Sequence, residues 1–338
     1  MDILPLLLPI GAGITVFGLI TLSMPVLRSH ALARPNQRSS HKVPTPQGGG
    51  IFIIAATILV AAFGIYSEAL FKTQAVTLVC LFGGAALLAM IGAIDDLRAL
   101  NALPRFVLQT GVIFAVVATL PADFRVTEIF PWWIERAFIV IALLWFVNLV
   151  NFMDGIDWMT VVEIVPVTAA LAIFGLQGAL PRDATLIALA LCGAVGGFAP
   201  FNRPVARLFL GDVGSLPIGL LVGWLLALLA RDHFVAALLL PLYYLADATI
   251  TLLRRLFRRE RITQAHRSHF YQRAMDGGLP VYVIVGRIFI ANIALAALAT
   301  ITLLNATIPT QAICLLAGCT IVATLLWTFN RPASPCPA

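Results

Sequence analysis

The sequence predicts an all-α, polytopic integral membrane protein, folded as a single domain over residues 1–338 with about eleven transmembrane helices. Two observations lead to this class. The chain is 60% hydrophobic and 11% charged, whereas soluble domains are about 25% charged. Apolar stretches of about twenty residues, each long enough to cross a bilayer as a helix, recur along the chain.

The apolar stretches give the order of the helices. Short loops separate them, and no internal repeat or low-complexity segment divides the chain. We expect helices at residues 3–27, 48–67, 74–94, 104–121, 136–153, 159–178, 184–201, 213–230, 234–253, 280–303 and 310–328.

The basic residues predict how these helices cross the membrane. Sixteen Lys and Arg residues lie in the tail and in the loops after odd-numbered helices, and five lie in the other loops. Because basic loops stay in the cytoplasm, Met1 should lie outside and Ala338 inside. This asymmetry accounts for the net charge of +6 without a nucleic-acid partner. No basic segment precedes the first apolar run, so we expect no cleaved signal peptide.

The fifth stretch ends in an unusual polar segment. Asn148 and Asn151 lie three residues apart, as do Asp154 and Asp157, so each pair shares one helix face. Gly155 allows a tight turn or a close approach to a ligand. A charged side chain near hydrocarbon costs about 2.5–3.5 kcal/mol on insertion scales, so such groups usually mark function or lie at the interface. The alternative is an ordinary polar helix end.

Two carboxylate motifs should lie on the same, cytoplasmic side. Asp95 and Asp96 follow the third helix and precede Arg105. Because adjacent carboxylates repel, one often keeps its proton or a cation holds both; the alternative is a solvated acid pair. Asp212 lies between glycines at the start of the eighth helix. A carboxylate there can hold magnesium that bridges to a phosphate, or it can be a simple N-cap.

The loop after the ninth helix carries a third candidate motif. His266, Arg267 and His269 follow a run of arginines that is typical of an anchor on the anionic leaflet. They could bind a diphosphate, whereas a zinc site would need more ligands. Asp247, inside the ninth helix, is expected to pair with a neighbouring basic group. Gly49 belongs to a glycine triplet that allows close backbone approach or a flexible turn.

Taken in this order, the motifs resemble those of the polyprenyl-phosphate N-acetylhexosamine-1-phosphate transferases (MraY/WecA-like, glycosyl transferase family 4), over nearly the whole chain. The matching residues are Asp95 and Asp96, then Asn148, Asn151, Asp154 and Asp157, then Gly211, Asp212, Gly214 and Ser215, and finally His266 and His269. The segment His-Arg-Ser-His-Phe-Tyr-Gln-Arg is similar to the subgroup that initiates O-antigen or capsule chains. In two departures, Arg105 stands where many relatives carry lysine, and Trp158 follows Asp157.

The resemblance implies transfer of an N-acetylhexosamine 1-phosphate from a UDP-sugar to undecaprenyl phosphate, with release of UMP, at the cytoplasmic face of the bacterial inner (plasma) membrane. It implies Mg²⁺ as the cofactor, with Mn²⁺ as the alternative. The implied partners are a UDP-sugar, polyprenyl phosphate and the lipid bilayer, and a homodimer stays open. The implied catalytic residues are Asp95, Asp96, His266, Arg267 and His269, the substrate-binding residues are Asn148, Asn151, Asp154, Asp157, Gly49 and Arg105, and the metal ligands are Asp212 and Asn151.

A polytopic transporter is the rival class. Transporter sites normally lie near the bilayer midplane, between repeats and on broken helices. Here the carboxylates lie at helix ends on one expected side, and no repeat is visible. A purely structural scaffold would leave this one-sided clustering unexplained.

Overall fold

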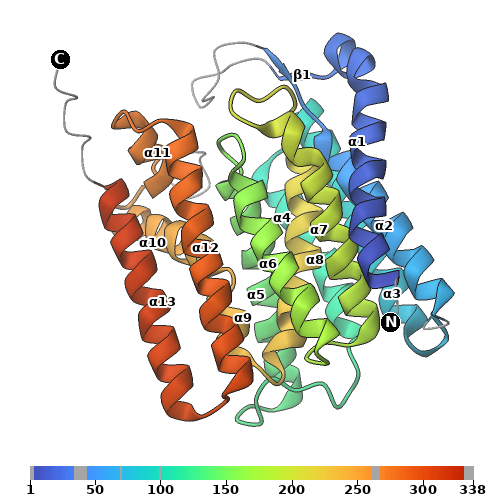
Figure 1. Cartoon of the computed structure of the whole chain (residues 1–338), viewed down its shortest axis with the longest axis vertical. Coiled ribbons are helices and arrows are strands. Elements are labelled where there is room, and N and C mark those ends of the chain that lie inside the picture. The colour runs from blue at the N-terminus through green and yellow to red at the C-terminus, as the bar shows by residue number, and fades with distance from the viewer. Residues whose placement is uncertain (1–3, 34–43, 69–70, 99, 261–266, 331–338) are drawn as a thin grey trace.

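A computed structural model describes residues 4–33, 44–68, 71–98, 100–260 and 267–330. Helices make up nearly all of the regular structure in these ranges (Figure 1). They are α1 (Leu4–His30), α2 (Gly49–Ser67), α3 (Phe71–Leu97), α4 (Ala102–Ala118), α5 (Trp132–Met153), α6 (Met159–Leu176), α7 (Arg182–Asn202), α8 (Asp212–Ala230), α9 (Phe234–Leu239), α10 (Leu242–Phe257), α11 (Phe270–Asp276), α12 (Val281–Leu304) and α13 (Ile308–Phe329). Strands β1 (Leu32–Ala33) and β2 (Thr45–Pro46) form a small antiparallel pair. The predicted helical membrane class is confirmed.

Fewer helices than predicted are long enough to cross a membrane within the described ranges. Nine helices in the described ranges are long and apolar enough to cross a membrane, against about eleven predicted. The predicted fourth helix, α4, is 17 residues long and falls just short. The predicted ninth is broken, because α9 ends at Leu239 and α10 begins at Leu242. Pro241 explains the break, since proline has no backbone N–H to donate to a continuing helix.

Helix α8 is the central helix of the bundle. It packs against α2, α3, α5 and α9. Of its most apolar stretch of 18 residues, 83% is buried inside the protein. A helix that is apolar on all sides is typical of such a buried position. Helices α10 to α13 form a group beside α5 and α6 (Figure 1). In the same view α1 begins at the lower end of the bundle and α13 ends at the upper end.

Glycines fix the start of α8 between two neighbouring helices. A Cβ atom on Gly50 of α2 would lie 2.1 Å from the Cα atom of Gly214. One on Gly92 of α3 would lie 2.3 Å from the carbonyl carbon of Asp212. Small residues let membrane helices approach backbone to backbone. The sequence therefore holds Asp212 between α2 and α3.

Candidate active site at the start of α8

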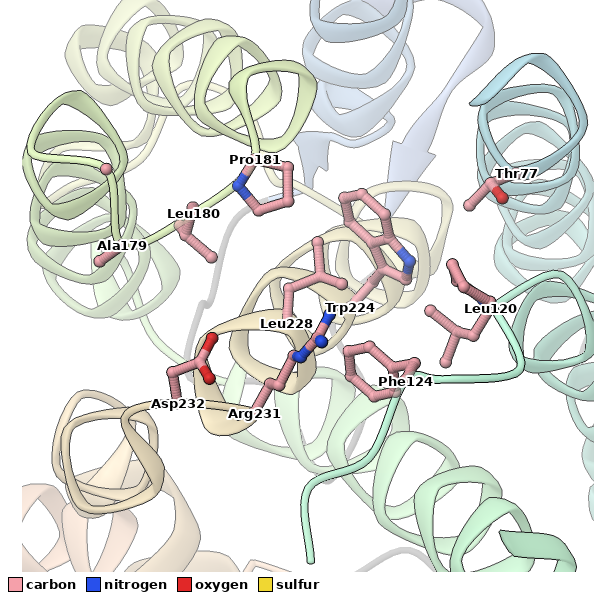
Figure 2. A pocket seen from close by; sticks show the side chains of 12 residues that line it. Thr77, Leu120, Phe124, Ala179, Leu180, Pro181, Trp224, Leu228, Arg231 and Asp232 are labelled. Carbon is pink, nitrogen blue, oxygen red and sulfur yellow. The ribbon is translucent and has the colours of Figure 1, made fainter. Parts of the chain in front are cut away.

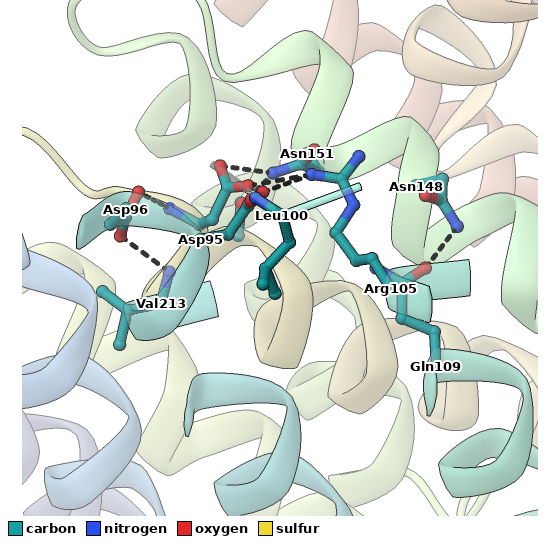
Figure 3. Close-up of polar contacts among 10 residues, drawn as sticks. Asp95, Asp96, Leu100, Arg105, Gln109, Asn148, Asn151 and Val213 are labelled. Atoms are coloured by element: carbon teal, nitrogen blue, oxygen red, sulfur yellow. Dashed lines mark hydrogen bonds and ion pairs between the residues drawn. The ribbon is translucent and has the colours of Figure 1, made fainter. Parts of the chain in front are cut away.

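Three side chains from three other helices meet at Asp212 (Figure 3). Arg105 Nη1, on α4, lies 3.3 Å from Asp212 Oδ2 and 2.5 Å from Asp95 Oδ2 on α3. Asn151 Nδ2, on α5, donates to Asp212 Oδ1 at 2.7 Å and to Ser215 Oγ at 2.9 Å. The side chain of Asp212 keeps 28% of its surface exposed. Residues predicted from three separate motifs therefore form one polar cluster.

Asp95 and Asp96 occupy different positions although they are adjacent. The Asp96 carboxylate accepts hydrogen bonds from the backbone N–H groups of Asp212, at 3.0 Å, and Val213, at 3.2 Å. It therefore caps α8, whose own N-cap residue, Gly211, has no side chain to do so. Asp95 accepts from the backbone of Leu100 at 2.6 Å and faces the arginine of the cluster.

The donor atoms around Asp212 meet the requirements of Mg²⁺. Within the described residues no group of three or more His, Cys, Asp or Glu side chains could hold a metal ion. Mg²⁺ does not require one, because it is usually held by one or two carboxylates together with waters and substrate phosphates. Asp95 and Asp212 already share a cation, the guanidinium of Arg105. Asp212 and Asn151 therefore offer suitable oxygen donors, and their role as ligands stays a prediction.

Some polar residues of the segment from Asn148 to Asp157 stabilise the fold, and others lie at the site. Asn148 is buried and donates to Gln109 Oε1 at 2.9 Å. Asp157 is buried and accepts from the Ala206 N–H at 2.9 Å, which fixes the loop before α8. Asp154 accepts from Thr160 Oγ1 at 2.5 Å.

The environment of Asp154 changes its protonation. This residue follows α5 and keeps part of its side chain exposed. The protein packed around it raises the pKa of Asp154 to about 7, and the charges of Asp96 and Asp157 add to that rise. The hydrogen bond from Thr160 acts in the opposite direction. Asp154 is therefore close enough to Asp96 to sense the carboxylates at α8.

The histidine motif forms a second, closed cluster. His269 Nδ1 lies 3.1 Å from Asp247 Oδ1, so the expected pairing of Asp247 with a basic group is confirmed. Asp247 also accepts from the N–H groups of Phe270, at 3.1 Å, and Tyr271, at 3.4 Å, at the start of α11. Arg267 Nη2 lies 3.0 Å from Asp276 Oδ1. His266 lies outside the described residues.

Tyr271 connects this second cluster to the polar segment after α5. Its hydroxyl donates to the Phe152 carbonyl at 3.4 Å. A Cβ atom on Gly155 would lie 2.1 Å from the same hydroxyl. The glycine is therefore needed for the approach of α11. Sequence reasoning gave no role to Thr160, and it missed the contact of Tyr271 because the partner, Phe152, lies 119 residues away.

Gly49 lies against the loop that leads into α8. Its N–H donates to the Phe209 carbonyl at 2.9 Å, and a Cβ atom there would lie 2.4 Å from the ring of Phe198. This contact explains the glycine by packing. Its predicted role in substrate binding stays a prediction.

A cavity lies at the other end of the bundle (Figure 2). Thr77, Trp224 and Arg231 are among its lining residues. Thr77 precedes Asp95 on α3 by a length of about 27 Å, at 1.5 Å per residue. The cavity is therefore separate from the carboxylate cluster.

These features define a multi-pass membrane protein with a carboxylate-rich site at the start of a buried helix. The model of glycosyl transferase family 4 matches residues 78–230, which include every carboxylate of the cluster. The chain is 30% identical to a "Phospho-N-acetylmuramoyl-pentapeptide-transferase" of Streptococcus pneumoniae (strain Hungary19A-6) over 271 residues, which are 72% of this chain and 80% of that protein. It is 29% identical over 261 residues to a "Probable undecaprenyl-phosphate N-acetylglucosaminyl 1-phosphate transferase" of Bacillus subtilis (strain 168), which cover 74% of this chain and 71% of that protein. The chain belongs to glycosyl transferase family 4, as its motifs predicted.

Proposed function

We propose that this protein transfers an N-acetylhexosamine 1-phosphate from a UDP-sugar to undecaprenyl phosphate and releases UMP. In this proposal the reaction is the first membrane step of a cell-surface polysaccharide, with O-antigen or capsule as the expected product class. The names of the relatives, which describe sugar-phosphate transferases, support this reading. The rival transporter reading has one feature in its favour, the break between α9 and α10. The carboxylates do not lie at that break.

One observation carries the proposal. The partly exposed Asp212 stands at the N-terminus of α8, between the cationic Arg105 and the amide of Asn151. The Asp96 carboxylate already accepts the N–H groups of Asp212 and Val213, so a phosphate at this site would be held by Arg105 and by a cation on Asp212. Phosphoryl transfer needs alignment and charge neutralisation more than covalent chemistry.

The residues divide the work as follows. A Mg²⁺ ion held by Asp212 and Asn151 would neutralise charge on the diphosphate. Arg105 bridges Asp95 and Asp212 and holds both carboxylates in place. Arg267, with His266, would bind the sugar-side phosphate as charge develops. Asp95 would orient the lipid phosphate, which needs little base help because its second pKa is about 6.

The same geometry favours direct attack by the lipid phosphate over an aspartyl intermediate. A nucleophilic carboxylate needs a free oxygen in line with the phosphorus. Both Asp95 oxygens accept hydrogen bonds, from Leu100 and Arg105, and both Asp96 oxygens cap α8.

Lipid-linked product analysis tests the proposal. Membranes containing the protein are incubated with undecaprenyl phosphate and several labelled UDP-N-acetylhexosamines, and the lipid product is identified by mass. We expect one donor to give a lipid diphosphate sugar in step with UMP. The same membranes carrying Asp212→Asn are the control. Label that enters no lipid with any donor, while the wild-type protein is folded, would refute the function.

The orientation is part of the proposal, and two loop residues of matched exposure can test it. Val205, in the loop before α8, is 80% exposed, and Ile129, in the loop before α5, is 81% exposed. We expect the first to face the cytoplasm and the second the periplasm. Each is changed to cysteine in a cysteine-free background and labelled from outside with an impermeant thiol reagent. Labelling of Ile129→Cys alone is expected, and labelling of Val205→Cys alone would place the site on the wrong side.

A further inference from the structure

A buried acid in the middle of the bundle takes no part in the cluster at α8. Glu163, on α6, is 1% exposed. Its Oε2 atom accepts a hydrogen bond of 2.7 Å from Nδ2 of Asn292 on α12. Glu163 Oε1 and Asn292 Oδ1 are both buried and make no hydrogen bond within the described residues. Each of the two paired groups therefore has one satisfied atom and one unsatisfied oxygen.

The two unsatisfied atoms have the same deficiency. A carboxylate oxygen and an amide oxygen are both acceptors, so neither can satisfy the other. A single proton on Glu163 changes this, because the carboxylic acid can then donate to Asn292 Oδ1 while Asn292 Nδ2 donates to Glu163 Oε2. One proton would satisfy two buried acceptors at once. Leaving each unsatisfied costs the desolvation penalty of a buried polar atom.

A second buried glutamate of the bundle provides the contrast. Glu135, at the start of α5, is 4% exposed. Its Oε2 atom accepts from Arg125 Nε at 2.5 Å, and its Oε1 atom accepts from the backbone N–H groups of Val126 and Thr127. Donors and a cation surround this carboxylate, as an ionised group requires. No cation contacts Glu163 among the described residues.

One neighbour of Glu163 favours its ionised form. The backbone N–H of Tyr244 faces its carboxyl group from the first turn of α10. A helix N-terminus stabilises a negative charge. The penalty for burying an ion is larger than this stabilisation, and the protonated acid can still accept from this N–H through its carbonyl oxygen. Burial therefore outweighs the helix terminus.

We propose that Glu163 is a neutral carboxylic acid that forms a reciprocal pair with Asn292. This pair clamps α12 against α6, as a proton-dependent lock between the group of helices α10 to α13 and the rest of the bundle. The lock also positions the reaction site, a part of the proposal that rests on the proposed function. Thr160, one turn before Glu163 on α6, donates to Asp154. Tyr244 lies near both Thr160 and Glu163, and its buried hydroxyl makes no hydrogen bond within the described residues. Loss of the proton would disturb Tyr244 and, through it, the Asp154 segment.

Other titratable groups lie near this part of α6. Tyr244 faces Glu163 from α10, and Asp154 precedes α6. Cys192, on α7, contacts the Val165 carbonyl further along α6. Helix α8 has no titratable residue after Asp212. A substitution that removes only the Glu163 carboxyl group therefore isolates its contribution.

Thermal unfolding of the purified full-length protein in detergent tests the lock without any assay of transfer. Glu163→Gln replaces the neutral acid with an amide of the same shape. The unfolded chain releases this proton at about pH 4.3, whereas the folded protein retains it. The wild-type Tm, measured relative to Glu163→Gln, should therefore fall as the pH rises from about 5, by about 2 °C per pH unit, until Glu163 ionises. A difference that stays constant with pH would overturn the proposal.

Infrared spectroscopy keeps the test decisive if Glu163→Gln folds poorly. Because Asp154 is also partly protonated at pH 7, the test uses difference spectra. We expect the carbonyl stretch of a protonated carboxylic acid in the wild-type spectrum at pH 7 after subtraction of the Glu163→Gln or the Glu163→Met spectrum. Glu135→Gln is the matched control and should leave this band unchanged. A difference spectrum without this band would show that Glu163 is ionised.

In the transfer assay, wild-type kcat should fall relative to Glu163→Gln above the pH at which the Glu163 band disappears, with KM unchanged. Parallel kcat profiles would overturn the positioning role and leave the lock intact.

Discussion

The clusters around Asp212 and Asp247 have a similar arrangement and differ in their exposure. In both, an aspartate lies beside a basic side chain and the start of a helix. Asp247 is fully buried, and its two oxygens are shared by His269, Tyr243, Thr251 and the α11 backbone. Asp212 is 28% exposed and contacts Arg105 and Asn151. An aspartate that is fully buried among its partners builds the fold, whereas one that is partly exposed can also reach a ligand.

The comparison is sharpest within the adjacent pair Asp95 and Asp96. Under direct attack, Asp95→Asn should lose about 10²–10⁴-fold in rate, because it removes the charge beside Arg105 that orients the lipid phosphate. Asp96→Asn keeps one oxygen to cap α8 and should lose less. Steady-state rates of both folded variants give the ratio. A stoichiometric UMP burst without lipid phosphate, abolished by either change, would show that an aspartyl intermediate forms.

Asp212→Asn tests the open cluster itself. It preserves the shape of the side chain and removes the charge expected to hold the metal. We expect the rate to fall by about 10²–10³-fold, as when a main electrostatic element is lost, with little change in Tm because the side chain is partly exposed. Asp232→Asn, an exposed aspartate at the opposite end of the bundle, is the control. Near-normal turnover of folded Asp212→Asn would move the metal site elsewhere.

The sequence predicted the helices well because their signal is local. An apolar run of the right length is visible in the chain itself, and the α8 motif could be recognised from its glycines and Asp212. Two features depended on distant residues. The capping of α8 by Asp96 joins positions 116 residues apart, and Glu163 finds Asn292 129 residues away. Spacing along one helix carries no record of such contacts.

The closed cluster should respond through stability. Asp247→Asn leaves His269 and the start of α11 with a weaker acceptor, and we expect the free energy of unfolding to fall by about 3–5 kcal/mol, the cost of breaking a buried pair. Denaturant unfolding in detergent measures it. Asp276→Asn breaks the more exposed pair with Arg267 and should cost at most about 1 kcal/mol. Equal losses in the two variants would mean that burial does not distinguish the two clusters.

The smallest expected effect concerns Asp154, which lies between the open and the closed cluster. Because the pKa of Asp154 is raised to about 7, the side chain is mostly neutral at pH 6 and mostly ionised at pH 8. Hydrogen bonds to charged groups contribute about 1 kcal/mol more than those to neutral groups. If Asp154 binds the sugar nucleotide, its KM should fall about fivefold between these pH values, measured at saturating undecaprenyl phosphate.

Two variants separate this titration from that of the substrates. Asp154→Asn cannot ionise, so its KM should stay near the wild-type value at pH 6 and show no step. Thr160→Val removes the hydrogen bond that lowers the pKa of Asp154, so the step should move to higher pH. A step that persists in Asp154→Asn would assign the titration to another group. A step that moves to lower pH in Thr160→Val would contradict the hydrogen bond as its cause.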